Sequence, residues 1–325
     1  MRNVAFTLVM MPPHTPVKRN WAARVAADEI GVRVLQPETT EEAVRDIADA
    51  DAAFGAIPPE ALAAAHRLRW LQAPQIAPPA GFYYPELVAH PVVVTNFREI
   101  FNDHIGAHIM AFVLAFARGF HYYLPQQMRC EYLPRSLDTG VVHLPGSAAL
   151  ILGVGGIGSE AARLCDAFGM RVIGVDGRRT ERPEGVDELH RPEHLDALLP
   201  HADFVIMTIP HTPATEGLIN RKRLRQMKPS AFLINIGRGM TVRLDDLVGA
   251  LHANEIAGAA LDVFEIEPLP ADHPLWTAPN VLITPHTAGY GPYLDDRRFD
   301  ILLDNCRRFA AGHALRNVVD KASWF

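Results

Sequence analysis

Apolar residues gather along this chain in short runs, separated by stretches in which apolar positions recur every three or four residues. The short runs are rich in Val, Ile and Ala, which is typical of buried β-strands, and the longer spacing is typical of amphipathic helices. The two patterns alternate along most of the chain. This alternation predicts an α/β fold in which helices cover both faces of a parallel sheet.

The first hundred or so residues hold one such series, which predicts one small α/β domain. The predicted strands are Val4–Val9, Val32–Leu35, Ala52–Phe54, Leu68–Leu71 and Val92–Thr95. The predicted helices are Trp21–Glu29, Glu41–Ala48 and Pro59–His66.

A second, stronger series follows a long apolar helix predicted at Asn102–Arg118 and a Pro- and Gly-containing connection from Pro125 to Gly146. Its predicted strands are Ala148–Leu152, Val172–Val175, Phe204–Thr208, Phe232–Asn235, Gly258–Leu261 and Val281–Thr284. A last helix is expected at Pro292–Ala311. We therefore expect two doubly wound domains, one formed by residues 1–100 with 289–325 and the other by residues 101–288.

Composition narrows the kinds of partner. Of 325 residues, 49% are hydrophobic and 21% charged, with a formal net charge of −6 and a pI near 6.2, so neither a nucleic acid nor an anionic membrane surface is an expected partner. Three cysteines without close spacing suggest no disulfide framework and no zinc site. The N-terminus resembles a strand more than a signal peptide, and the apolar run Ile109–Ala117 is too short for a membrane span, which needs about 20 residues. We expect a cytoplasmic protein.

A glycine-rich turn stands between the strand that ends at Leu152 and a helix predicted at Ser159–Phe168. In this G-x-G-x-x-G pattern, Gly153 would permit the tight turn, Gly155 would let the backbone approach a pyrophosphate, and Gly158 would let the helix pack close to the strand. The free N–H groups of the helix N-terminus would then face the phosphates.

The next strand ends on Asp176, where a dinucleotide-binding domain often holds the ribose hydroxyls with an acid. Such an acid favours NAD and repels the 2′-phosphate of NADP. Arg178 and Arg179 follow at once and are able to hold that phosphate. We predict NAD as the cofactor and NADP as the weaker alternative. The alternative without a cofactor is that the glycines form a structural turn and that Asp176 is solvated.

Three later strands end in residues suited to the reduction of a keto acid. Arg238 lies between two glycines and offers a planar donor pair for a carboxylate. His286 is a candidate general acid, and Glu265 or Glu267 is a candidate partner for its ring. On spacing alone, each has an ordinary alternative: Arg238 as a salt-bridge residue, the acids as loop residues and His286 as the cap of a turn.

With these segments in order, the sequence resembles the D-isomer-specific 2-hydroxyacid dehydrogenases, which include phosphoglycerate, glyoxylate/hydroxypyruvate and D-lactate enzymes. The resemblance spans the second half of the chain. The matching segments are Gly153–Gly158, Ala167–Met170, Pro210–Thr215, Lys228-Pro229, Asn235–Gly239, Gly258–Pro268 and Thr284–Gly289.

The resemblance implies a Rossmann NAD-binding domain, a smaller flavodoxin-like substrate domain and a homodimer. It also implies that Arg238 binds the substrate carboxylate, that His286 is the general acid/base, and that Glu267, which directly precedes a proline, pairs with His286. Residues implied to line the cofactor, besides Gly153, Gly155, Gly158 and Asp176, are Gly156, Ile157, Pro210, Thr215, Ile236, Asp262 and Gly289.

The first half departs from the family pattern. Where relatives carry a Gly-rich turn that holds the substrate carboxylate, this chain has Gln72–Gly81, rich in proline, so Ala73, Gln75 and Ile76 are only candidate substrate-binding residues. On the long helix, Gly106-Ala107 replaces the family's Ala-Glu pair. His104 and His108 have i, i+4 spacing that a metal ion could use, but without further ligands nearby we favour packing and expect no metal.

The function expected from these residues is hydride transfer between NAD(H) and a small 2-oxo or D-2-hydroxy acid. One alternative is an NAD(H)-sensing protein that resembles the co-repressor relatives. Another is a dehydrogenase of a different small oxyanion such as phosphite, while a formate dehydrogenase is disfavoured by the Glu at the position that pairs with His286.

Overall fold

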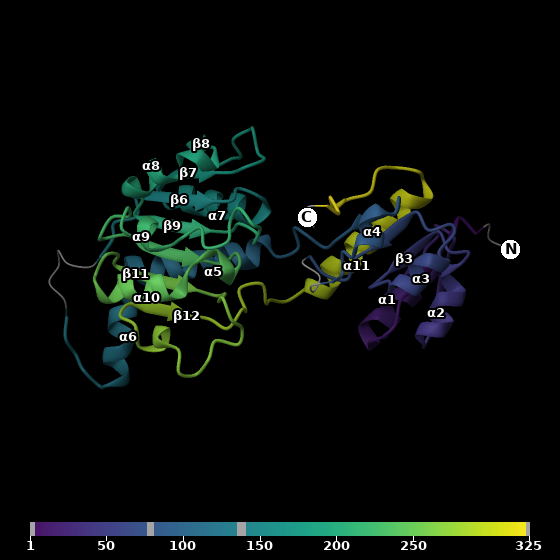
Figure 1. Cartoon of the computed structure of the whole chain (residues 1–325), viewed down its shortest axis with the longest axis horizontal. Helices are drawn as coiled ribbons and strands as arrows, with labels where there is room; N and C mark the ends of the chain where they lie inside the picture. The colour runs from purple at the N-terminus through teal and green to yellow at the C-terminus, as the bar shows by residue number, and fades with distance from the viewer. Residues whose placement is uncertain (1–3, 77–80, 135–140, 323–325) are drawn as a thin grey trace. The chain divides into compact units, whose positions relative to one another are not determined.

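The computed structural model describes residues 4–76, 81–134 and 141–322, and the chain divides into two compact units. Unit 1 comprises Met1–Ile100 and Pro292–Phe325, and unit 2 comprises Phe101–Gly291. Each unit is built on its own parallel sheet, which confirms the predicted fold class of two α/β domains (Figure 1).

Unit 1 contains a five-stranded sheet in the order β2-β1-β3-β4-β5, the order of flavodoxin-like folds. Its strands are β1 (Phe6–Met10), β2 (Val32–Leu35), β3 (Ala52–Phe54), β4 (Trp70–Gln72) and β5 (Val93–Thr95). Its helices are α1 (Pro16–Ala27), α2 (Thr40–Ile47), α3 (Pro59–Ala64), α4 (Pro85–Ala89) and α11 (Leu294–Ala310).

Both faces of this sheet are covered. On one face Val9 and Leu71 pack in a buried cluster with Ile47 of α2 and Leu62 of α3. On the other face the ring of Phe309, from α11, lies 4.9 Å from that of Phe6 and 5.5 Å from that of Trp70. The last helix of the chain therefore completes the core of the first unit, and unit 1 is formed by segments from both ends of the sequence.

Unit 2 contains a seven-stranded sheet in the order β12-β11-β10-β9-β6-β7-β8, with all neighbouring strands parallel. The strands are β6 (Ala148–Leu152), β7 (Arg171–Val175), β8 (Glu188–His190), β9 (Phe204–Met207), β10 (Phe232–Asn235), β11 (Gly258–Leu261) and β12 (Val281–Ile283). The helices are α5 (Asn102–Ala117), α6 (Phe120–Met128), α7 (Gly156–Ala167), α8 (Leu195–Leu198), α9 (Arg221–Leu224) and α10 (Leu244–His252). The strand order reverses between β6 and β9, which is the Rossmann arrangement and the place where such sheets bind ligands.

Alternating strand residues divide the core of unit 2 into two layers. Leu150 and Leu152 of β6 pack in the cluster that includes residues of α8, α9 and α10. Ala149 and Ile151 point to the other face, into the cluster formed with α5 and α7. Because side chains of a strand alternate between faces, the near-continuous apolar run of β6 is buried on both sides.

Several elements differ from the prediction. Helices α4, α8, α9 and α10 were not predicted, and α1, α6 and β8 differ for reasons that the structure shows. Helix α1 begins at Pro16, before the predicted Trp21, because the Thr15 hydroxyl accepts the Lys18 N–H as an N-cap and proline fits the first helical turn. The predicted connection from Pro125 begins inside α6, which includes that proline. Residues 135–140 of the connection lie outside the described part of the chain. Strand β8 is short and polar, and gave no apolar run to predict it.

Candidate active site

The glycine-rich turn joins β6 to α7 at the reversal of strand order. A Cβ atom on Gly158 would lie 1.9 Å from the Gly153 oxygen, so glycine is required there for the turn to close. A Cβ atom on Gly155 would meet nothing within 4 Å. The protein itself therefore leaves open the space beside Gly155, at the N-cap of α7, and this fits the approach of a pyrophosphate. Gly156 and Ile157 form the first turn of α7.

Asp176 follows β7 and binds the same turn. One carboxylate oxygen accepts the Val154 N–H, and the other accepts the N–H groups of Arg178 and Arg179, each with a nitrogen–oxygen distance of 2.8 Å. Burial alone would raise the pKa of Asp176, but these backbone hydrogen bonds and the Arg179 charge outweigh it and lower the pKa. The carboxylate is thus held as an anion beside the turn.

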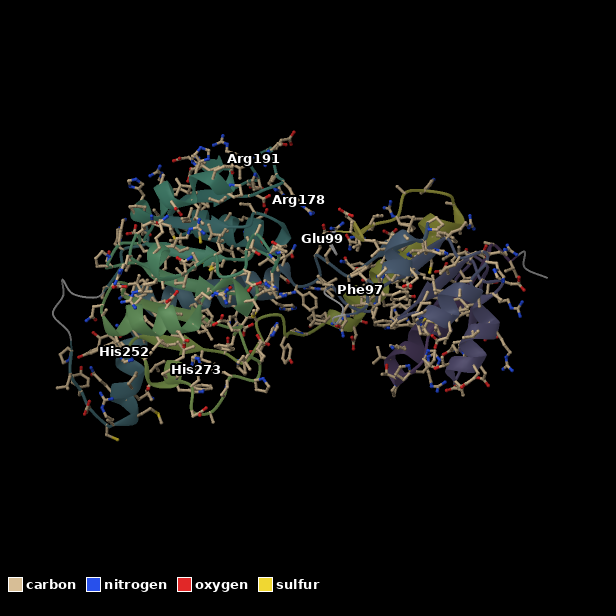
Figure 2. The ribbon with its side chains drawn as sticks, viewed as in Figure 1. Phe97, Glu99, Arg178, Arg191, His252 and His273 are labelled. Carbon is tan, nitrogen blue, oxygen red and sulfur yellow. The ribbon has the colours of Figure 1, made fainter. Side chains whose placement is uncertain are left out.

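Arginines surround the same end of the sheet. Arg191, which follows β8, donates to the Gly177 oxygen at 2.9 Å, and Figure 2 shows Arg178 and Arg191 at this end of unit 2. An anionic Asp176 and a basic surrounding thus lie where the ribose of a bound dinucleotide is expected.

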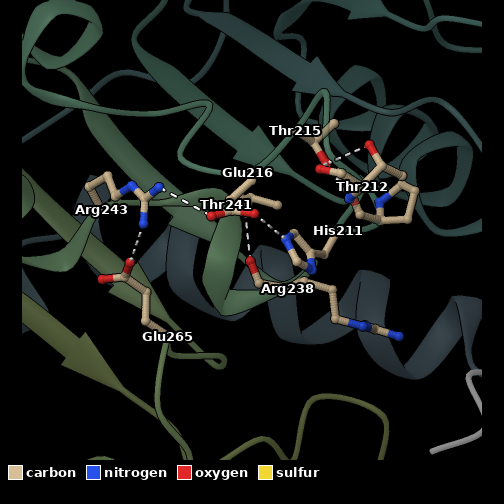
Figure 3. Close-up of polar contacts among 9 residues, drawn as sticks. His211, Thr212, Thr215, Glu216, Arg238, Thr241, Arg243 and Glu265 are labelled. Atoms are coloured by element: carbon tan, nitrogen blue, oxygen red, sulfur yellow. Dashed lines mark hydrogen bonds and ion pairs between the residues drawn. The ribbon is translucent and has the colours of Figure 1, made fainter. Parts of the chain in front are cut away.

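Hydrogen bonds of the Thr215 hydroxyl stabilise the loop after β9. The Thr215 hydroxyl donates to the Pro210 oxygen at 2.7 Å and accepts the Thr212 N–H at 2.8 Å. Figure 3 shows Thr215 beside Thr212, with Glu216 lying between His211 and Arg243. Pro210 and Thr215 therefore lie at the carboxyl edge of the sheet, next to the glycine-rich turn's strand in the sheet order.

Arg238 follows β10 on a loop whose backbone is fixed. Its oxygen accepts hydrogen bonds from the Thr241 hydroxyl at 2.6 Å and from the Asn235 amide at 3.2 Å. A Cβ atom on Gly239 would lie 1.9 Å from the carbonyl of Phe264, so this glycine lets the Arg238 loop pack against the segment after β11. Ile236 is buried at the start of the loop.

The Arg238 side chain is exposed, and one guanidinium nitrogen donates to the Gly237 oxygen at 2.7 Å. Part of the Arg238 side chain is accessible to solvent, but protein atoms packed around the guanidinium desolvate it and lower its pKa. The negative charge of Glu267 counteracts that shift. The group stays charged at any physiological pH.

His286 and Glu267 form a close pair. The His286 Nδ1 lies 2.6 Å from one carboxylate oxygen of Glu267, and the other oxygen accepts the Phe264 N–H at 2.9 Å. Glu265, the rival acid, points elsewhere: it accepts the Leu244 N–H at the start of α10 and pairs with Arg243 (Figure 3). The geometry therefore joins His286 to Glu267 and assigns Glu265 a capping contact.

The backbone of His286 is held in an unusual conformation. Its φ is +55°, in the left-handed region that costs a non-glycine residue on the order of 1–2 kcal/mol. Hydrogen bonds to Asp262 offset this cost. The backbone carbonyl oxygen of Asp262 accepts the His286 N–H at 2.8 Å, and its carboxylate accepts the N–H groups of Thr287 and Ala288. Asp262 is 1% exposed, so it is an internal anchor of this loop as well as a candidate cofactor residue. Gly289 follows the anchored segment.

The candidate substrate-binding residues Ala73, Gln75 and Ile76 belong to unit 1, where they follow β4. The Ala73 N–H donates to the Thr95 oxygen at 2.7 Å, so it continues the sheet. Gln75 is exposed, and the Ile76 oxygen accepts the Asn96 side-chain amide at 3.3 Å. Residues 77–80, which include the prolines Pro78 and Pro79, lie outside the described part of the chain.

The polar neighbours of Asp262 were not predicted from the sequence. His108 lies 3.0 Å from the Thr284 hydroxyl, which in turn lies 2.6 Å from the Asp262 carboxylate. Within the described ranges, no three His, Cys, Asp or Glu side chains are grouped so as to hold a metal ion. No helix in those ranges is both long and apolar enough to cross a membrane.

The arrangement is suited to acid–base chemistry on an anion. Arg238, Glu267 and His286 follow β10, β11 and β12, which are neighbours in the sheet, so all three are presented at its carboxyl edge. A fixed cation, a carboxylate and an imidazole with one nitrogen held by that carboxylate are able to bind a carboxylate and transfer a proton.

Comparisons with known proteins agree with this geometry. Residues 110–288 match the sequence model described as "D-isomer specific 2-hydroxyacid dehydrogenase, NAD binding domain". A curated relative, glyoxylate/hydroxypyruvate reductase A of Serratia proteamaculans, is 35% identical over 214 residues, which is 66% of each chain. For the first three curated relatives, the match covers only 56% to 66% of their length.

Two solved structures cover almost the whole chain. One is a D-isomer specific 2-hydroxyacid dehydrogenase from Xanthobacter autotrophicus in complex with NADPH and MES, with 26% identity, a TM-score of 0.81 and coverage of 98% of this chain and 99% of that one. The other is an NADPH-dependent glyoxylate/hydroxypyruvate reductase from Sinorhizobium meliloti in complex with NADP and sulfate, with 26% identity, a TM-score of 0.77 and coverage of 98% and 100%.

Proposed function

Because the chain belongs to the D-isomer specific 2-hydroxyacid dehydrogenase family, we propose that it reduces a small 2-oxo acid to the D-2-hydroxy acid with a nicotinamide dinucleotide. The observation that carries the proposal is the 2.6 Å contact between His286 and Glu267, at strand ends next to the one that Arg238 follows. Glyoxylate and hydroxypyruvate are the first candidate substrates, since the relatives from Serratia and Sinorhizobium bear their names.

In the proposed reaction, Arg238 binds the substrate carboxylate through its planar donor pair, which orients the neighbouring carbonyl. The bound cofactor supplies the hydride. His286 gives its proton to the carbonyl oxygen, which becomes the hydroxyl group of the product. A carboxylate oxygen of Glu267 accepts a hydrogen bond from the Nδ1–H of His286, which leaves Nε2 to give the proton to the substrate, and the carboxylate would stabilise the protonated ring.

The residues around the glycine-rich turn would hold the cofactor: the amides at the start of α7 for the pyrophosphate, and Asp176 for the adenosine ribose. We propose NADH as the preferred form, supported by the anionic carboxylate of Asp176. This preference for NADH would be weakened by the positive charges of Arg178, Arg179 and Arg191, which could bind the 2′-phosphate of NADPH. Two solved relatives bind NADPH or NADP. A cytoplasmic location is part of the same proposal.

A substrate panel tests the proposed activity. Wild-type protein is mixed with NADH or NADPH and glyoxylate, hydroxypyruvate, pyruvate or phenylpyruvate, and with NAD and phosphite in the reverse sense. We expect turnover with at least one 2-oxo acid. Tight NADH binding without turnover of any acid would contradict the proposal and favour a dinucleotide sensor, while turnover of phosphite alone would favour the other oxyanion.

We also propose that the protein is a homodimer. Helix α6 carries Phe120, Leu124 and Met128, which are 52%, 51% and 84% exposed, and Tyr132 beyond it is 95% exposed. Apolar side chains clustered in this way are typical of a surface that another protein covers, and a second copy with two-fold symmetry is the expected partner.

A further inference from the structure

A chain of three polar side chains connects helix α5 to the loop that carries His286. His108, on α5, places its Nε2 at 3.0 Å from the hydroxyl oxygen of Thr284, at the end of β12. That hydroxyl lies 2.6 Å from a carboxylate oxygen of Asp262, at the end of β11. The three residues are far apart in sequence, and all belong to unit 2.

The direction of these hydrogen bonds follows from the chemistry of the groups. The Asp262 oxygen that Thr284 contacts also accepts the Thr287 N–H at 2.8 Å, so it acts as an acceptor. The single hydroxyl hydrogen of Thr284 therefore points to Asp262, and the Thr284 oxygen accepts the N–H of His108. Burial lowers the pKa of His108, against a smaller opposite effect of the Asp262 charge, so the ring is a neutral donor near neutral pH.

Asp262 in turn holds the loop that carries His286. Its buried carboxylate accepts hydrogen bonds from the Thr287 and Ala288 amides, and its backbone carbonyl oxygen accepts one from the His286 amide. These are the contacts that hold His286 in its left-handed backbone conformation. A change in the orientation of the Asp262 carboxylate would therefore move the backbone on which the imidazole stands.

We propose that His108 and Thr284 are positioning residues, which orient the Asp262 carboxylate and through it fix His286 for proton transfer. The inference rests on the proposed function. The ring of His108 also packs edge-on against Phe112 of the same helix, with centroids 4.7 Å apart, and this contact helps to orient the imidazole.

The test compares two substitutions of Thr284 that differ in the hydroxyl. Thr284→Ser keeps the hydrogen bonds, and Thr284→Val keeps the shape but loses them. The kcat is measured with the best 2-oxo acid of the panel, NADH affinity by fluorescence titration, and stability by thermal unfolding. We expect Thr284→Val to lower kcat about tenfold or more, the effect of losing one hydrogen bond to a buried charged group, and to change NADH affinity less than about threefold. Thr284→Ser is expected to retain at least about a third of the wild-type kcat.

Ser147→Ala is the matched control for stability. The Ser147 hydroxyl is buried in the same unit and donates to the Leu144 oxygen at 2.7 Å, but it precedes β6 and lies at the opposite edge of the sheet. Its loss is expected to lower the melting temperature without lowering kcat. Adding His108→Leu to Thr284→Val should lower kcat no further than the single change, because both act through one chain of hydrogen bonds.

The outcomes separate this inference from the proposed function. If the wild-type protein turns over no 2-oxo acid, the proposed function fails and the inference falls with it. If the wild type is active but Thr284→Val keeps kcat within about twofold, the proposed function stands and the positioning role is wrong. Equal losses of kcat in Thr284→Val and Thr284→Ser, or additive losses in the double variant, would also overturn it.

Discussion

Among single residues, Asp176 stabilises the fold and is proposed to bind the cofactor as well. Its carboxylate binds three backbone amides, one of them in the glycine-rich turn, so it shapes the turn that is expected to meet the pyrophosphate. The same negative charge would repel a phosphate on the ribose. The identity of the cofactor thus depends on the balance between this anion and the arginines around it.

Asp176→Asn tests that balance. Asparagine keeps an oxygen that can accept the amides of Arg178 and Arg179, but it removes the charge. We expect the ratio of kcat/KM for NADPH to that for NADH to rise about tenfold or more, since one removed charge contact is worth on the order of 1.4 kcal/mol. Steady-state kinetics with both cofactors measures it, with Arg178→Ala as the opposite control. An unchanged ratio would show that Asp176 does not select the cofactor.

The candidate site could be predicted from the sequence only where its residues form local motifs. The glycine-rich turn and Asp176 are readable because they follow predicted strands at short range. The choice of Glu267 over Glu265 needed the resemblance, since spacing alone left both acids open. The contact between His108 and Thr284 joins residues 176 positions apart, and it exists only because α5 packs against the sheet of unit 2. No local pattern contains that information.

Among the secondary-structure elements, most strands were predictable because burial on both faces leaves them as apolar runs, and the short polar strand β8 was not. Helix boundaries were less predictable: α1 begins earlier than predicted because of the Thr15 cap, and α6 continues through Pro125. Gly106, one departure from the family pattern, lies close to α7: a Cβ atom there would lie 2.7 Å from the side-chain Cγ of Glu160, which would have to shift.

The start of α10 gives a prediction that separates the two acids. Glu265 accepts the Leu244 N–H at 2.8 Å, so Glu265→Ala should remove a cap worth about 1 kcal/mol and lower the melting temperature by a few degrees, with little loss of kcat. Glu267→Ala should do the reverse and lower kcat strongly. Thermal unfolding and kinetics on both variants are the measurement. Loss of kcat in the Glu265 variant alone would reverse the assignment.

At the scale of the whole molecule, the exposed apolar face of α6 predicts the assembly. The wild type is expected to have twice the mass of one chain in light scattering after size-exclusion chromatography. Leu124→Glu combined with Met128→Glu places charges on this face and should yield a monomer. Arg129→Glu, a change at an already exposed polar position, is the control. A monomeric wild type, or a dimer that the double variant does not disturb, would exclude α6 as the interface.

The proposed function depends on the pair of His286 and Glu267, which neighbouring strand ends bring together. The most direct test measures kcat for a 2-oxo acid and the affinity for NADH in the wild type and in His286→Ala. We expect turnover by the wild type, a loss of about a hundredfold or more in the variant, as for removal of a general acid, and NADH affinity within about threefold of the wild type. A variant that keeps its turnover, while still binding NADH, would contradict the assignment of His286 as the proton donor.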